Sequence, residues 1–256
     1  LVLKDSAWGA TIPGWSDANP DCGTTNGVTC DGSGMITKLD VAYNPNVFTG
    51  SIPASISALK KLQILRLPYS KLTGSIPDGI TLLTDLTYLN LNGNQLTGPL
   101  PEALGSLSNL RQLYISKNNF TGPIPSTIGA LQYLDGLYME ENQFSGPIPD
   151  SIGGLQSVTT LVLSYNKLSG SIPATITNLT SLYNLHLADN QLNGSIPIEV
   201  FTHPRMLFID LGRNQLSGSI PSPLPPARLK DLSFGQNQLT GTIPAKFALL
   251  TTINRL

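Results

Sequence analysis

Apolar residues and glycines recur along this chain at one fixed spacing. The tetrapeptide Gly-x-Ile/Leu-Pro appears nine times, and seven of the eight intervals between successive copies are 24 residues, while the last is 23. Its glycines are Gly50, Gly74, Gly98, Gly122, Gly146, Gly170, Gly194, Gly218 and Gly241. A period of 20 to 50 residues is typical of proteins built from stacked coils. The pattern therefore predicts a repeat architecture.

A second pattern, L-x-x-L-x-L-x-x-N-x-L-x-G, precedes each tetrapeptide. In the third repeat it comprises Leu86, Leu89, Leu91, Asn94, Leu96 and Gly98. The L-x-L step has the period of a strand with one buried face. A segment such as Pro125, Ile128, Gly129 and Leu131 then returns the chain to the next strand. Each repeat is expected to form one coil, which contains a strand, a turn and a short helical or extended return.

One coil cannot bury its leucines alone, whereas stacked coils bury a continuous core. The predicted fold class is an α/β repeat solenoid, a right-handed leucine-rich-repeat superhelix with a parallel β-sheet on the concave face. We expect a partial N-terminal cap over residues 1–35 and repeats over residues 36–256, nine complete and a tenth cut short at Leu256. No C-terminal cap is visible, and solenoids need capped ends. A partner or a further segment is expected to cover that end.

An asparagine column marks the turn after each strand. The chain bends sharply there and leaves inward-pointing backbone groups without partners in the sheet, and an amide side chain offers both an acceptor and donors. Ser70 is the exception, where a hydroxyl does part of the task. The expected structural asparagines are Asn46, Asn94, Asn118, Asn142, Asn166, Asn190, Asn214 and Asn237.

The full motif, L-x-x-L-x-L-x-x-N-x-L-x-G-x-I-P, resembles the plant-type extracellular leucine-rich repeat. The segment with Trp15, Cys22 and Asn26-Gly-Val-Thr-Cys30 is similar to the N-terminal cap of that family, although Thr24 and Thr25 stand where the second Trp of the cap signature belongs. The family includes polygalacturonase-inhibiting proteins, ectodomains of receptor kinases and receptor-like proteins, and ice-binding relatives. The resemblance implies extracellular recognition of a protein, peptide or glycan.

Composition narrows the partners. Charged residues make up 12% of the chain and the net charge is -1, with no basic patch for a phosphate backbone, so nucleic acid is not expected. No apolar run approaches the roughly 20 residues that cross a bilayer, and no signal peptide is visible. Because the chain begins at Leu1 rather than Met, we interpret it as processed or trimmed.

Cys22 and Cys30 lie in a loop rich in Gly, Thr and Asn. They are either a disulfide, which we favour, or chance thiols. A metal site needs further ligands, and both histidines, His186 and His203, are far along the chain. A disulfide predicts an oxidising compartment, and so do three possible N-glycosylation sites, at Asn119, Asn178 and Asn193. The expected location is extracellular or the secretory pathway.

The non-leucine positions of the strands are expected to face the concave side, which is the family's usual ligand surface. Five of the eight tyrosines fall in these columns. We interpret them as an aromatic, hydrogen-bonding strip, although tyrosine also favours strands in general. The candidate ligand-binding residues are Arg66, Tyr69, Tyr88, Asn90, Tyr114, Lys117, Tyr138, Glu140, Glu141, Tyr165, His186, Asp189, Asp210 and Arg213.

Charges in these columns fall one repeat apart, which predicts pairs. The pairs are Lys117 with Glu141, Asp189 with Arg213, and His186 with Asp210. Such surface pairs mostly keep a face soluble and contribute about 0–1 kcal/mol each. The alternative is an acidic patch for a basic partner, formed by Glu140, Glu141, Asp189 and Asp210.

Catalysis is not expected, and no catalytic residue, metal or cofactor is assigned. His186 and Asp210 have no adjacent nucleophile, and nothing indicates that Glu140 or Glu141 is buried enough to act as an acid. The Gly32-x-Gly34 segment lacks the third glycine of a phosphate-binding loop.

The expected function is non-enzymatic extracellular recognition of a protein or peptide through the concave face, inhibitor-like or receptor-like. A structural or scaffold subunit docked in a larger assembly is an alternative, and so is an ectodomain fragment of a membrane receptor kinase. An ice-binding role needs a flat, regular, threonine-rich face, and the concave columns offer none.

Overall fold

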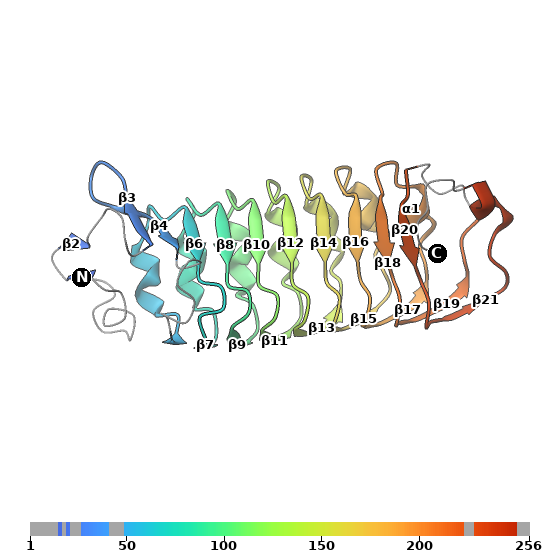
Figure 1. Cartoon of the computed structure of the whole chain (residues 1–256), viewed down its shortest axis with the longest axis horizontal. Helices are drawn as coiled ribbons and strands as arrows, with labels where there is room; N and C mark the ends of the chain where they lie inside the picture. Colours follow the sequence, from blue (N-terminus) through green and yellow to red (C-terminus); the bar gives the residue numbers. More distant parts are fainter. Residues whose placement is uncertain (1–14, 17–18, 21–26, 41–48, 223–227, 250–256) are drawn as a thin grey trace.

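The structure is a computed structural model. It describes residues 15–16, 19–20, 27–40, 49–222 and 228–249. Within them the chain forms stacked coils, each with one short strand at the front and a second strand at one side (Figure 1). The expectation of a leucine-rich-repeat solenoid with a parallel sheet is confirmed.

A ten-stranded sheet runs the length of the described chain. Nearly all neighbouring strands are parallel and 24 residues apart in register, as Leu113 opposite Leu137 shows. At one end β3 pairs antiparallel with β4. The strands are β3 (Val28–Cys30), β4 (Ile36–Asp40), β6 (Ile64–Arg66), β8 (Tyr88–Asn90), β10 (Gln112–Tyr114), β12 (Gly136–Tyr138), β14 (Thr160–Val162), β16 (Asn184–His186), β18 (Phe208–Asp210) and β20 (Asp231–Ser233).

A second, nine-stranded parallel sheet was not expected. It forms around the repeated glycines, where residues such as Leu96 point inward and their neighbours point outward. The strands are β5 (Gly50–Ser51), β7 (Leu72–Gly74), β9 (Gln95–Gly98), β11 (Asn119–Gly122), β13 (Gln143–Pro147), β15 (Lys167–Gly170), β17 (Gln191–Ser195), β19 (Gln215–Ser219) and β21 (Gln238–Thr240). A separate antiparallel pair joins β1 (Trp15–Ser16) to β2 (Asn19–Pro20).

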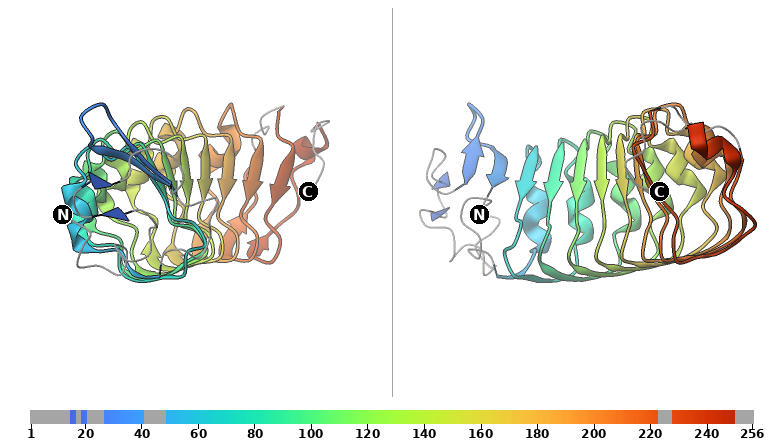
Figure 2. Two further views of the ribbon diagram at one scale, coloured as in Figure 1. Left: turned by 60° about the vertical axis from the view of Figure 1, so that its left-hand side comes forward. Right: turned by 45° about the vertical axis from the view of Figure 1, so that its right-hand side comes forward.

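The return path is a single helical turn in most coils, and these turns lie behind the front sheet (Figure 2). The 3-10 helices η1 to η6 each follow a proline, whose fixed φ suits the position before a helix. The helices are η1 (Ala54–Ala58), η2 (Asp78–Leu82), η3 (Glu102–Ser106), η4 (Ser126–Ala130), η5 (Asp150–Gly154), η6 (Ala174–Asn178), α1 (Ile198–Thr202) and η7 (Ala245–Leu249).

The core is a set of stacked leucine and isoleucine columns between the two sheets and the helical turns. Leu89, Leu113 and Leu137, for example, are fully buried. Phe120 and Phe144 stack between neighbouring coils with their ring centroids 6.0 Å apart. Because each coil buries its leucines against both neighbours, the repeat is stable only as a stack.

The asparagine amides join neighbouring coils. Asn142 Oδ1 accepts a hydrogen bond from the backbone N–H of Phe120 (3.1 Å), and its Nδ2 donates to the carbonyls of Ile115 (3.0 Å) and Met139 (3.1 Å). The other described asparagines of the column repeat this arrangement, whereas Asn46 lies outside the described residues. At the exception, the Ser70 hydroxyl donates only to the carbonyl of Pro68, in its own coil.

From β6 onward, the turn after each front strand contains a left-handed residue, five positions before the repeated glycine. This conformation is uncommon outside glycine. It places the side chain beyond the end of the strand and not on the strand itself. Gly93 occupies this position in the third repeat, and the non-glycine residues are Tyr69, Lys117, Glu141, Tyr165, Asp189, Arg213 and Gln236.

Candidate ligand-binding face

The candidate residues lie on the outer side of the ten-stranded sheet or in the turns that directly follow its strands, and we call this combined surface the front face. They fall into two sets. Strand positions that point outward carry Arg66, Tyr88, Asn90, Tyr114, Tyr138, His186 and Asp210. The turns beyond the strands carry Tyr69, Lys117, Glu140, Glu141, Tyr165, Asp189 and Arg213.

Three tyrosines from neighbouring strands form a continuous stack, which we call the tyrosine row (Tyr88, Tyr114 and Tyr138). The ring centroids of Tyr114 and Tyr138 are 4.5 Å apart with an interplanar angle of 7°, and those of Tyr88 and Tyr114 are 5.5 Å apart at 36°. Gly136 makes room for this stack, because a Cβ there would lie 2.7 Å from Cε2 of Tyr138. The parallel register therefore turns a sequence repeat into a row of rings.

The pKa of Tyr114 is raised to about 12, chiefly by burial. Its two neighbours in the row, Tyr138 and Tyr88, raise it further because their own ionisable hydroxyls are near. A phenol ionises less readily where its anion loses solvation and faces other ionisable phenols. The Tyr114 hydroxyl is therefore neutral and able to donate a hydrogen bond at physiological pH.

Arg66 covers the end of the tyrosine row. Its guanidinium carbon lies 5.5 Å from the centroid of the Tyr88 ring, and its Nη1 is 3.1 Å from Asp40 Oδ2. Lys38 reaches the same carboxylate oxygen at 3.1 Å. The sequence did not lead us to assign Lys38 or Asp40 to the site, although their alternating positions in β4, two residues apart, indicated that both share one face of the strand.

The remaining two tyrosines of the expected strip stand apart from the row. Tyr69 and Tyr165 lie in the turn column and are 56% and 54% exposed. The Tyr69 ring lies against Gly93 of the next coil, where a Cβ would come within 2.2 Å of the ring. The strip through the first six repeats is therefore a three-residue row with two separate exposed rings.

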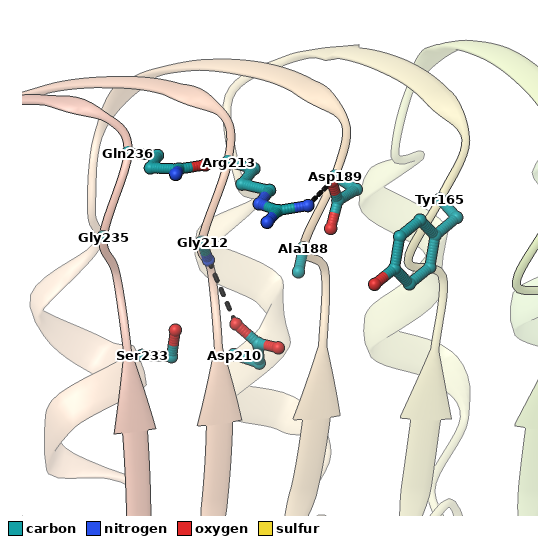
Figure 3. A pocket seen from close by; sticks show the side chains of 9 residues that line it. All are labelled: Tyr165, Ala188, Asp189, Asp210, Gly212, Arg213, Ser233, Gly235 and Gln236. Carbon is teal, nitrogen blue, oxygen red and sulfur yellow. Dashed lines mark hydrogen bonds and ion pairs between the residues drawn. The ribbon is translucent and has the colours of Figure 1, made fainter. Parts of the chain in front are cut away.

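A hollow of about 380 Å³ opens toward the C-terminal end of the front face (Figure 3). Its floor is formed by small residues, Ala188, Gly212 and Gly235, which follow the buried Leu187 and Leu211 and the half-buried Phe234. Its walls bring together four residues assigned from the sequence and two that were not: Tyr165, Asp189, Asp210 and Arg213, with Ser233 and Gln236. The run of small residues in one column was the signal for this hollow.

Polar groups of the hollow are held by short contacts. Arg213 Nη1 lies 3.3 Å from Asp189 Oδ1, and the backbone N–H of Gly212 donates to Asp210 Oδ1 at 3.2 Å (Figure 3). The hollow therefore presents a guanidinium, carboxylates and a phenol around an open floor, which suits polar ligand groups better than apolar ones.

A smaller pocket of about 200 Å³ adjoins the hollow and shares Asp210 and Ser233 with it. Here the pKa of His186 is lowered from the usual 6.5, because burial disfavours the imidazolium more than Asp210, Glu140 and Asp231 favour it. His186 is therefore neutral at physiological pH. No hydrogen bond between His186 and Asp210 occurs in the structure, although the two residues are neighbours in register.

Two of the three expected charge pairs form contacts. Lys117 lies 3.5 Å from Glu141, and Arg213 pairs with Asp189. In the described part of the chain, Glu140, Asp210 and Asp231 take part in no salt bridge. The expected acidic patch is therefore partly neutralised, and its remaining charge lies around His186.

The expected disulfide and glycosylation sites are described by the structure only in part. Cys30 ends β3, but Cys22 lies outside the described residues, so the disulfide stays a prediction. The side chains of Asn119, Asn178 and Asn193 are exposed, and their glycosylation also stays a prediction. Over the described ranges no cluster of three or more potential metal ligands occurs, and no helix could span a membrane.

The model of the leucine-rich repeat family matches residues 85–107, 109–131, 133–155 and 157–179. Solved structures match over most of the chain. The ectodomain of the Arabidopsis thaliana receptor kinase GASSHO1/SCHENGEN3, in complex with CASPARIAN STRIP INTEGRITY FACTOR 2, is 36% identical with a TM-score of 0.88, over 95% of this chain and 30% of that chain. The Arabidopsis receptor kinase HAESA, in complex with the peptide hormone IDA and the co-receptor SERK1, is 27% identical with a TM-score of 0.78.

The match to HAESA covers 98% of this chain and 50% of that chain. A plant ice-binding protein is 30% identical with a TM-score of 0.69, over 92% of this chain and 84% of that chain. No curated protein matches significantly. The repeat motif, the two sheets and these similarities show that the chain belongs to the plant-type leucine-rich repeat proteins. It spans half or less of the receptor ectodomains that it resembles, and no enzymatic family is indicated.

Proposed function

We propose that this protein is a non-enzymatic, extracellular recognition module that binds a peptide through its front face in a receptor-like manner. The observation that carries the proposal is the combination of the tyrosine row and the hollow on one sheet face. Tyrosine is enriched at binding surfaces because it combines apolar area with a polar tip. Solved relatives of this fold hold a peptide hormone, which favours a receptor-like role over an inhibitor-like or scaffold role.

The charge distribution of the front face favours a ligand that places a basic group against the C-terminal repeats of this protein. Glu140, Asp210 and Asp231 surround the neutral His186 there, while Arg213 is paired with Asp189. Complementary charge gives specificity and faster association more than raw affinity. A ligand of this kind should bind faster at low salt.

The proposal is tested with a phage-displayed library of random dodecapeptides panned against the chain. The tightest peptide is synthesised, and its affinity is measured by calorimetry for the wild type and for Asp210→Asn and Tyr138→Ala. We expect both changes to weaken binding at least several-fold. A matched change away from the front face, Tyr133→Ala, should leave affinity unchanged. No enriched peptide, or binding indifferent to both front-face changes, would contradict the proposal.

A second candidate function rests on the outer side of the nine-stranded sheet, which we call the hydroxyl face. One exposed column there consists of Ser51, Ser75, Pro99, Pro123, Pro147, Ser171, Ser195, Ser219 and Thr242. A second column lies beside it, with Thr73, Thr97, Thr121, Ser145, Ser169, Asn193, Ser217 and Thr240. Strands follow one another in a line along this side (Figure 1).

Apart from Pro99, Pro123, Pro147 and Asn193, these columns consist of hydroxyl side chains, and such a surface favours ice binding, the role of one solved relative of this fold. The concave columns lacked this feature, but the second sheet supplies it. Two of the predicted glycosylation sites, Asn119 and Asn193, lie on the same face, so attached glycans would cover it. This is why peptide recognition remains our first proposal.

The second candidate is tested by measuring thermal hysteresis of the unglycosylated chain. Thr97→Tyr places a bulky ring in the hydroxyl face, and Thr84→Tyr is the control at an exposed threonine of the return path. Ice binding predicts hysteresis in the wild type and in Thr84→Tyr, and its loss in Thr97→Tyr. Absence of hysteresis in the wild type excludes this function.

A further inference from the structure

Two of the three rings of the tyrosine row, Tyr88 and Tyr114, are already covered on both faces. Tyr114 lies between the rings of Tyr88 and Tyr138, and Tyr88 lies between Tyr114 and the Arg66 guanidinium. A ring bound on both faces has no free face on which a ligand could stack. Aromatic recognition of sugars, bases or cations usually needs such a face. The row therefore offers a ligand mainly ring edges and hydroxyls.

The row places three hydroxyl-bearing rings side by side. The ring centroids are 4.5 and 5.5 Å apart on neighbouring strands, and burial keeps the pKa of Tyr114 at about 12. Each neutral phenol has one O–H to donate and lone pairs to accept. The three hydroxyls form a strip of hydrogen-bonding groups along the solenoid, fixed by the stacked rings beneath them.

The charges around this strip nearly balance. Asp40 contacts both Arg66 and Lys38, Lys117 is paired with Glu141, and Glu140, which takes part in no salt bridge among the described residues, offsets the second cation. Neighbouring strands lie roughly 4.8 Å apart, so three strands span about 10 Å. An extended peptide advances about 3.3–3.6 Å per residue, so this length corresponds to roughly three residues.

We propose that the tyrosine row recognises uncharged hydrogen-bond acceptors, such as the carbonyl oxygens of about three residues of an extended peptide, through its hydroxyl edges and not by stacking on ring faces. This inference rests on the proposed peptide-binding function. It specifies the chemistry by which the N-terminal half of the front face would bind the peptide. It places the peptide along the solenoid axis, across the front strands. The charged or basic part of the peptide then lies toward the hollow.

The test uses the synthetic dodecapeptide selected as described above and compares loss of the hydroxyl with loss of the ring. Tyr114→Phe and Tyr138→Phe keep the stack and remove one hydroxyl each, whereas Tyr138→Ala removes the ring. Each Phe change should weaken binding about three- to tenfold, as for loss of one hydrogen bond. The double Phe variant should weaken it further. Tyr133→Phe, outside the front face, is the matched control and should bind like the wild type.

Three outcomes separate the inference from the function on which it rests. If the Phe variants bind like the wild type while Tyr138→Ala fails, recognition is apolar and the inference is wrong, although the front face still binds the peptide. If none of the tyrosine changes matters but Asp210→Asn abolishes binding, the row is not part of the site and the inference is again wrong. If no dodecapeptide is selected at all, the proposed function itself fails. Near-ultraviolet circular dichroism of the Phe variants checks that the stack is retained.

Discussion

At the residue scale, single buried asparagine amides connect the turns of neighbouring coils by hydrogen bonds. Each described asparagine of the column accepts a hydrogen bond from a backbone N–H of the preceding coil. Its amide nitrogen donates to carbonyls of the preceding coil and of its own coil, as Asn142 shows. Backbone groups in these turns are shielded from water and have no partner in either sheet. The sequence indicated why an amide belongs there, but the identity of its partners required the stacked coils.

Asn142→Ala should lower the free energy of unfolding by about 1–3 kcal/mol, because the Phe120 N–H and three carbonyls lose their partner in a buried turn. Urea unfolding measures the change. Gln95→Ala, at an exposed position of β9, is the control and should change stability by less than about 0.5 kcal/mol. Equal stability of Asn142→Ala and the wild type would show that the amide is dispensable.

The two histidines should make stability depend on pH. Burial lowers the pKa of His186 and His203 below the usual 6.5. His203 Nε2 lies 2.9 Å from the carbonyl of Leu179, and its Nδ1 is buried without a partner, so protonation at Nδ1 is disfavoured. A depressed pKa means stability that is complete above pH 6.5 and is lost as the pH falls through the folded-state pKa.

We therefore expect the urea concentration at the unfolding midpoint to decrease as the pH is lowered from 7.5 to 5.5. Carboxylates ordinarily titrate below this pH range. His203→Gln and His186→Gln should each flatten this dependence, and the double variant should flatten it more. An unchanged slope in both single variants would count against this account.

At the scale of the element, the helical turns pack so closely that several of them require glycine. A Cβ at Gly129 of η4 would lie 1.9 Å from the carbonyl oxygen of Ser151, which belongs to η5. A clash with backbone atoms cannot be relieved by a change of rotamer, as a clash with a flexible side chain can. The equivalent glycines in neighbouring coils, Gly105 and Gly153, meet the same kind of contact.

Gly129→Ala should therefore force η4 and η5 apart and lower the thermal midpoint by several degrees, as overpacking of a tight contact costs about 1–3 kcal/mol. Gly32→Ala is the matched control, since no atom lies within 4 Å of a Cβ there and its φ is not left-handed. If Gly129→Ala and Gly32→Ala both melt at the wild-type temperature, the coils have more room at Gly129 than the structure indicates.

At the scale of the whole molecule, stability depends on neighbours, because each coil contacts only the coils beside it. Strands in the middle of the front sheet are paired on both sides, whereas β20 is the outermost strand of the part that the structure describes. We expect native-state hydrogen exchange to be slowest in the doubly paired strands β10, β12 and β14. Uniform protection across all front strands would indicate a single cooperative unit instead.

The repeat, the leucine core and the asparagine column followed from the sequence, because a period of 24 residues admits few ways to bury one apolar stripe per coil. The outward-facing columns also followed, since strand positions alternate between the core and the outside. The second sheet did not, because its strands are short and the motif around Gly98 or Gly122 reads as a turn.

The sequence by itself determined which residues face outward, including the tyrosines and most of the charged residues around the hollow. Only the tertiary structure decided which of them meet. Parallel register at a spacing of one strand stacks Tyr88, Tyr114 and Tyr138, whereas the left-handed turns hold Tyr69 and Tyr165 apart. The small residues Ala188, Gly212 and Gly235 open the hollow only when three coils lie side by side. Contacts between coils depend on distances in space that no single repeat contains.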